Sequence, residues 1–226
     1  MLAGPDPLLT DRPLDPAVDT VATLRETGFT LEPAQTAPLL TTLPTRYHGE
    51  VDQVLLTALV TAVAAWRAER GGAARTLLAD LERHGRTDLG GADLSRTVGW
   101  FTAIHPVRLD LGALDPAAVL RGGAAADRAL KAVKEQLRAR PGDELGYGLL
   151  RYLNPDAEPL LAAAGTPQLA FNYLGRYQGP AAGAAPADWA PAPAARCSPQ
   201  ARTRTPRPPI RWTSAPGPRP PPTGRG

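Results

Sequence analysis

The chain has 226 residues, with 25 Lys and Arg against 22 Asp and Glu, a length that accommodates one or two domains. Residues 179–226 hold seven arginines and one acid, whereas residues 1–178 hold 18 bases and 21 acids. The basic character therefore belongs to the tail, and we expect no nucleic-acid binding by the body of the chain. A lone cysteine, Cys197, excludes an internal disulfide and a cysteine zinc cluster, which favours a cytoplasmic setting.

Nothing in the sequence predicts insertion into a membrane or export. The longest apolar stretch, residues 53–66, ends at Arg67 and is shorter than the roughly 18 residues of a membrane span. The first residues have neither a basic region nor an apolar core, so we expect no secretory signal.

The first elements in chain order are a linker, a strand and a helix. Residues 1–18 contain four prolines and little periodicity, which is typical of a linker. Apolar and polar residues alternate over residues 19–25, which predicts a short strand. Residues 31–43 then predict a short helix, with Pro33 in its first turn and Pro44 at its end.

The clearest element is an amphipathic helix over residues 51–66 that Gly71-Gly72 stops. Two strands are predicted next, over residues 75–82 and 101–111. Pro106 in the second strand indicates a sheet edge or a bulge, because proline cannot donate to a central ladder.

The remaining pattern alternates helices with one more strand. Asp115-Pro116 has the form of a helix start, and Gly122-Gly123 predicts a break before a helix over residues 127–138. A short helix over residues 147–153 and a strand over residues 168–174 follow. The order of elements predicts an α/β fold in which a mixed sheet packs with helices, followed by a disordered Pro- and Arg-rich tail over residues 179–226.

Five short motifs are more specific than the periodicity. They are VDQVLLTAL at 51–59, DLERHGR at 80–86, RTVGWFTAIHPV at 96–107, GYG at 146–148 and FNYLGRY at 171–177. In this order and spacing they resemble the epimerization domains of nonribosomal peptide synthetases, over about residues 19–178. The combination of RTVGWFT, GYG and FNYLG also separates epimerization domains from ordinary condensation domains.

The resemblance implies a fold and a reaction. Such domains have the chloramphenicol acetyltransferase fold, in which two α/β lobes enclose the active site, and residues 19–178 resemble the C-terminal lobe. They interconvert L and D at the α-carbon of an aminoacyl or peptidyl thioester held on the phosphopantetheine arm of a carrier protein. We therefore expect a carrier protein as partner, and no cofactor or metal on this chain.

Residue by residue, Glu82 matches the first Glu of the family's EGHGRE motif and is the candidate catalytic acid or base. His84, Gly85 and Arg86 match as well, whereas Arg83 replaces a glycine and Thr87 replaces the final Glu. A cation at Arg83 is expected to lower the pKa of Glu82 and to crowd the site. The other candidates that the motifs indicate are catalytic Asn172 and Tyr173, and substrate-binding His84, Trp100 and Tyr147.

Each candidate also has a structural interpretation. Glu82 could form an ion pair with Arg83 or Arg86 at a strand end. His84 could hold the turn, Trp100 could belong to the core, and Asn172 could be satisfied by a loop. Tyr147 between two glycines could reflect a backbone constraint alone.

The second catalytic motif of the family, HHxxxDG, is absent. The only histidines are His48, His84 and His105, and we expect the first and last at the surface or at strand ends. The resemblance thus implies a truncated domain, inactive by itself. Two alternatives stay open: a split epimerase completed by a separate N-terminal lobe, and a noncatalytic remnant that docks a carrier protein. From about residue 195 the sequence resembles a GC-rich gene translated out of frame.

Overall fold

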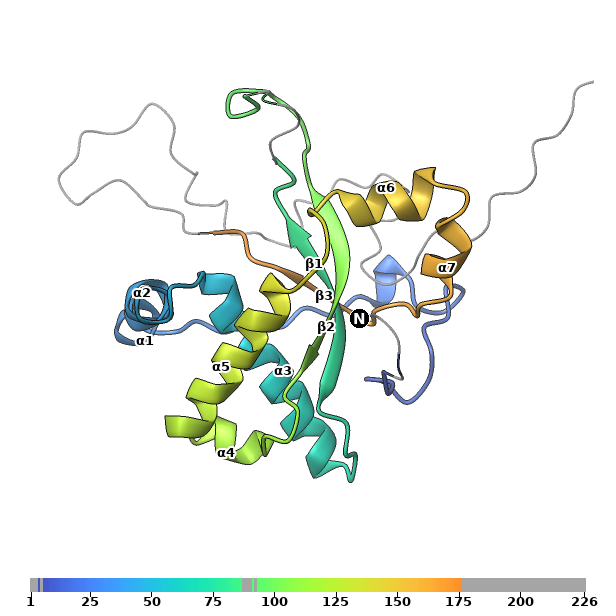
Figure 1. Ribbon diagram of the computed structural model, residues 1–226. Helices are drawn as coiled ribbons and strands as arrows, with labels where there is room; N and C mark the ends of the chain where they lie inside the picture. Colours follow the sequence, from blue (N-terminus) through green and yellow to red (C-terminus); the bar gives the residue numbers. More distant parts are fainter. Residues whose placement is uncertain (1–3, 5, 87–90, 92, 176–226) are drawn as a thin grey trace, which may run out of the picture.

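The computed structural model describes residues 4, 6–86, 91 and 93–175 (Figure 1). Thr87, Cys197 and the tail over residues 179–226 lie outside the described residues, so the expectations about them stay predictions. The elements are, in chain order, η1 Val21–Thr23, α1 Pro33–Ala37, η2 Pro38–Thr42, α2 Leu43–Tyr47, α3 Val51–Glu69, β1 Thr76–Arg83, β2 Ala103–Asp110, α4 Pro116–Leu120, α5 Gly123–Arg138, α6 Gly146–Leu153, α7 Glu158–Ala162 and β3 Leu169–Asn172.

The three strands form a mixed sheet in the order β2-β1-β3. The central strand β1 runs antiparallel to β2, with Thr76 opposite Asp110, and parallel to β3, with Ala79 beside Leu169. Pro106 therefore lies on an edge strand of the described sheet, as its missing N–H requires. The predicted α/β class with a mixed sheet is confirmed.

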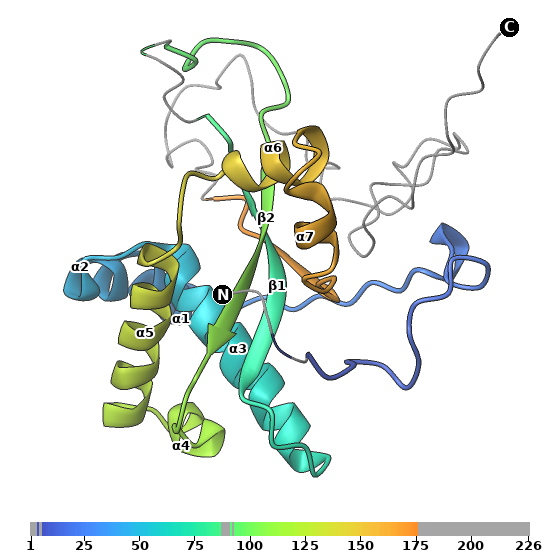
Figure 2. The same ribbon diagram turned by 45° about the vertical axis from the view of Figure 1, so that its right-hand side comes forward.

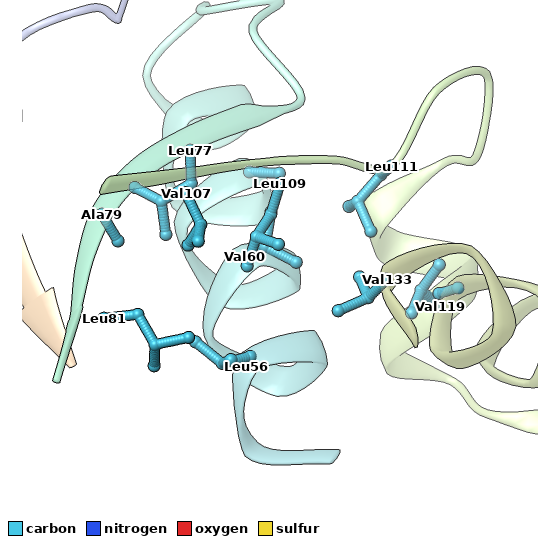
Figure 3. Packing of buried hydrophobic residues seen from close by; sticks show 12 residues of the cluster. Leu56, Val60, Leu77, Ala79, Leu81, Val107, Leu109, Leu111, Val119 and Val133 are labelled. Carbon is cyan, nitrogen blue, oxygen red and sulfur yellow. The ribbon is translucent and has the colours of Figure 1, made fainter. Parts of the chain in front are cut away.

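Alternation along β1 separates the core from the opposite face of the sheet. Leu77, Ala79 and Leu81 are buried against α3, which contributes Leu56 and Val60 (Figure 3). Residues from β2, α4 and α5 complete this core, namely Val107, Leu109, Val119, Ala129 and Val133. Both views of the ribbon show α4 and α5 to the left of the strands, and Figure 1 shows α6 and α7 to the right (Figures 1 and 2).

The long helix α3 is a core helix. Its length and composition would also suit a membrane span. However, its residues Leu56, Val60 and Ala64 are almost completely buried within the fold, where they contact the sheet and α5. This burial is what a core helix of a folded domain shows.

The N-terminal segment is attached to the body of the chain. Asp6 forms an ion pair with Arg67 at 3.2 Å, and both side chains are buried. The backbone N–H of Leu9 donates to Gln168 Oε1 at 2.9 Å, next to the start of β3. Part of the segment expected to be a linker thus contacts the sheet, while the domain boundary near residue 18 stays a prediction.

Several predicted elements differ from the observed ones. The strand over residues 19–25 is wrong: η1 is a single 3₁₀ turn with an exposed Val21, and no described strand pairs with it. Alternation alone does not make a strand without a neighbour to bond. The predicted helix over 31–43 is a run of three short helical segments from Pro33 to Tyr47, and α7 was not predicted at all.

Leu81→Ala should lower the free energy of unfolding by about 2–5 kcal/mol, because it opens a cavity where β1 packs on α3. Urea denaturation of the full chain measures the loss. Leu153→Ala, at a residue that is 75% exposed, is the matched control and should change stability little. Equal losses in the two variants would contradict this assignment of the core.

Candidate functional site

The candidate site lies on the face of the sheet opposite the core. We call this surface the site face and define it by the strand register as Asp80, Glu82, Ile104, Pro106, Ala170 and Asn172. Glu82 is paired with Ile104 across β2 and with Asn172 across β3. The structure therefore brings Glu82 and Asn172 together, although 90 residues separate them in the sequence.

Glu82 is held in a partly desolvated position. Burial raises the pKa of its carboxyl, and hydrogen bonding from the side chains of Thr102 and Asn172 lowers the pKa and so opposes this shift. The Oε2 atom is buried, and no described group hydrogen-bonds to it. A carboxyl with a raised pKa and one unused oxygen is suited to taking up or releasing a proton.

The turn after β1 requires its glycine. Gly85 has φ +57°, and a Cβ placed there would lie 2.0 Å from the carbonyl oxygen of Phe101. His84 Nδ1 accepts a hydrogen bond from the backbone N–H of Arg86 at 3.1 Å, and His84 itself is exposed. Arg86 donates to the carbonyl oxygens of Leu94 and Thr97. The hydrogen bonds of Arg86 attach the turn to the segment before β2. The hydrogen bond that His84 accepts lies within the turn, which agrees with its structural interpretation.

The expectation for Arg83 is wrong. Alternation directs its side chain to the core face, where it forms ion pairs with Asp52, with Glu50 at 3.1 Å and with Glu144 at 3.0 Å. Arg83 neither crowds Glu82 nor lowers its pKa, which is raised. The alternative ion pairs of Glu82 with Arg83 or Arg86 are absent among the described contacts, because both arginines are bound elsewhere.

A buried polar cluster surrounds Arg83. Asp52, whose side chain is 4% exposed, has its pKa raised by burial, and the positive charge of Arg83 opposes this shift. His105, expected at the surface or at a strand end, is the third residue of β2 and is buried on the core face in contact with Arg140. Burial, and then the charge of Arg140, lower the pKa of His105 to about 4, so it is neutral near pH 7. This cluster connects β1 to the start of α3 and to the segment before α6.

Asp80 was missed by the sequence analysis. It lies two residues before Glu82 on the same strand, between Pro106 and Ala170. Burial raises the pKa of its carboxyl to about 6. Because alternate residues of a strand share a face, the position of Glu82 was the signal that could have identified Asp80.

The aromatic candidates are placed differently from one another. Tyr147, at the start of α6, is half-buried, and burial raises the pKa of its phenol, with a further contribution from the negative charge of Asp80. Tyr173 is partly buried one residue beyond the end of β3. Trp100 is 83% exposed, so its expected place in the core is wrong, and Phe101 instead lies 4.3 Å beneath the Arg86 guanidinium.

Among the residues that the structure describes, no group of three or more His, Cys, Asp or Glu side chains is arranged to hold a metal ion. The polar groups of the site face are the carboxyls of Asp80 and Glu82 and the amide of Asn172.

Comparison with known proteins places the fold and the motifs in context. The profile of the Condensation domain family matches residues 5–185. One of the subunits of linear gramicidin synthase from Brevibacillus parabrevis is 40% identical over 178 residues, which is 77% of this chain. Chondramide synthase cmdD of Chondromyces crocatus is 46% identical over 156 residues, which is 69% of this chain.

A solved structure shows the same arrangement. The epimerization domain from the third module of tyrocidine synthetase B superposes on 66% of this chain with a TM-score of 0.53 and 36% identity. The chain spans 30% of that domain, and 2% and 4% of the lengths of the two synthases. The similarity thus covers a small part of each relative.

Arg83→Met should lower the free energy of unfolding by about 3 kcal/mol, because it leaves the buried Asp52 carboxylate without its cation. The double variant Arg83→Met/Asp52→Leu should recover most of this loss, as measured by urea denaturation. Arg138→Met, which removes an ion pair exposed on both sides, is the control and should have little effect. A double variant no more stable than Arg83→Met would contradict the coupling.

Asp80→Asn should remove a pH dependence of stability. The carboxyl has a pKa near 6 in the fold and an ordinary value of 3.8, so the folded state holds this proton more tightly. The preference of the fold for protonated Asp80 therefore adds to the free energy of unfolding fully below about pH 4, and this contribution is lost as the pH rises through about 6. The variant should therefore gain up to about 3 kcal/mol over the native chain at pH 8, and little at pH 3.5.

Urea midpoints measured between pH 3.5 and 8 report this difference. Asp156→Asn, at an exposed aspartate between α6 and α7, is the matched control and should run parallel to the native chain. Parallel curves for Asp80→Asn would show that Asp80 is not desolvated.

Proposed function

Because the chain belongs to the condensation-domain family, we propose that it supplies one half of an epimerization site that acts on an aminoacyl or peptidyl thioester carried by a carrier protein. The observation that carries this proposal is the pairing of Glu82 with Asn172 on the site face. Two motifs that resemble those of epimerization domains thus meet at adjacent strand positions. Similarity to a solved epimerization domain supports the same subtype.

The chemistry follows from the groups present. The Glu82 carboxylate takes the α-proton, and the electron pair of the C–H bond moves into the thioester carbonyl to give an enolate. The desolvation that raises the Glu82 pKa brings its basicity closer to neutral pH. The amide of Asn172, beside it in the register, is placed to donate a hydrogen bond to the enolate oxygen.

A second group has to act on the opposite face of the α-carbon. Inversion requires a proton donor there, and the 226 residues contain no HHxxxDG motif. We infer that this donor comes from a second lobe, either in the same polypeptide or on another one. Without it, one carboxylate can remove a proton but cannot return it to the other side.

Exposed apolar side chains support a partner lobe beside α6 and α7. The exposed residues include Leu149 at 54% and Leu153 at 75% on α6, and Leu160 at 75% on α7. Apolar groups of this size in neighbouring helices are typical of a surface that another body covers. We expect the second lobe to cover this surface.

The proposal is tested by hydrogen exchange at the α-carbon. The assay uses a phenylalanyl thioester on a phosphopantetheinylated carrier protein in deuterated buffer. The full chain alone should form no D-phenylalanyl thioester from the L form, because it acts on one face of the α-carbon only. A chimera, in which residues 5–175 replace the matching region of the tyrocidine synthetase B epimerization domain, should both incorporate deuterium and form the D product.

In that chimera, Glu82→Gln should slow exchange by at least about 100-fold, the usual contribution of a general acid or base. Asn172→Ala should slow it by about 100- to 1,000-fold. Glu135→Gln, at an exposed acid on α5, is the control and should leave the rate unchanged. Exchange that persists in Glu82→Gln at the control rate would refute the proposed role, and carrier binding without exchange in any form would favour the docking remnant.

A further inference from the structure

Asp80 is a partly buried carboxyl on the site face that has no partner among the described residues. Its neighbours in the register are Pro106 and Ala170, whose side chains cannot donate a hydrogen bond. Glu82 differs, because Thr102 and Asn172 hydrogen-bond to it. A carboxylate removed from water without a partner is unfavourable unless a cation or a donor from outside completes the site.

Two arginines, one on β2 and one on α6, are engaged with other groups. Arg108 faces the same side of the sheet one register position away, and its Nη2 donates to the carbonyl oxygen of Gly4 at 2.8 Å. Arg151 of α6 pairs with Glu158 at 3.5 Å and lies over the ring of Tyr152. The Tyr147 phenol is close enough for the negative charge of Asp80 to contribute to its raised pKa, but it carries no positive charge.

The spacing along β1 matches an amino acid bound at its α-carbon. Alternate residues of a strand are roughly 6.6 Å apart, which separates the Asp80 and Glu82 carboxyls by a similar distance. The oxygen of a carboxylate that removes an α-proton lies about 3 Å from the α-carbon. The bond from the α-carbon to its nitrogen is about 1.5 Å long, and an ammonium nitrogen lies about 2.8 Å from the carboxylate oxygen that accepts its hydrogen bond. These lengths together span about 7 Å, so Glu82 can contact the α-carbon while Asp80 contacts the nitrogen bonded to it.

We propose that Asp80 binds the free α-ammonium group of the substrate, and that this site therefore takes aminoacyl thioesters in preference to peptidyl thioesters. The inference rests on the proposed function and narrows its substrate class. In a peptidyl thioester the same nitrogen is an uncharged amide, which leaves the Asp80 carboxylate without a counter-charge. Ion pairing with Asp80 keeps the amine protonated, and a protonated amine makes the neighbouring α-proton more acidic.

The test compares two ligands that differ only at the α-nitrogen. The probes are alanyl-pantetheine amide and its N-acetyl derivative, in which a stable amide replaces the thioester. Binding to the full 226-residue chain is followed at pH 7.5 by NMR shifts of the amides of Ile104 and Ala170. We expect the free amine to bind at least about tenfold more tightly, and Asp80→Asn to reduce the ratio of the two dissociation constants to about one.

Asp156→Asn is the matched control and should keep the full ratio, while circular dichroism shows that each variant is folded. N-acetyl-ornithyl-pantetheine amide is a third probe, in which the only ammonium group is on the side chain. If it binds as tightly as alanyl-pantetheine amide and loses this affinity in Asp80→Asn, Asp80 recognises a basic side chain and the α-ammonium assignment is overturned.

The remaining outcomes separate this inference from the proposed function. Equal affinity of the native chain for the free and acetylated alanyl probes overturns the inference but leaves the site of Glu82 and Asn172 intact. Selectivity that persists in Asp80→Asn overturns it as well. Failure of all three probes to shift the site-face amides would overturn the proposed site itself, and this inference with it.

Discussion

The pairing of β1 on both of its edges is the constraint on which core and candidate site depend. Hydrogen bonds to β2 and β3 fix the strand as extended backbone, so its side chains alternate strictly between two faces. The side chains of Leu77, Ala79 and Leu81 therefore pack in the core with α3 and α5. The side chains of Asp80 and Glu82 lie on the opposite face. A shift of one residue in this register would exchange the core for the carboxylates.

The same alternation explains why Arg83 is tolerated next to Glu82. Its side chain belongs to the core face at the end of the strand, where Asp52, Glu50 and Glu144 surround it. The arginine therefore joins three separate segments of the chain: the end of β1, the start of α3 and the loop that leads to α6. This arrangement keeps its charge away from the site, so burial dominates the pKa of Glu82.

The two faces of the sheet also differ in how their charged groups are paired. On the core face, Arg83 forms ion pairs with Asp52 and Glu144, and His105 stays neutral beside Arg140, while one side-chain atom each of Asp52, His105, Arg140 and Glu144 is buried without a hydrogen-bond partner among the described residues. On the site face, Asp80 and one oxygen of Glu82 have no partner among the described residues. Desolvated polar groups without a partner cost stability, and on the site face a ligand can complete them. Stability and proposed chemistry are therefore carried by opposite sides of one strand.

The sequence by itself determined the long helix α3, the three strands and the motifs that indicate the family, because these depend on local periodicity and on short strings of residues. It also indicated Glu82 and Asn172 separately. Their adjacency, the inward turn of Arg83 and the burial of His105 were decided by the tertiary structure. Strand pairing joins residues far apart in the chain, and desolvation depends on everything packed around a group, so neither quantity can be read from neighbouring residues alone.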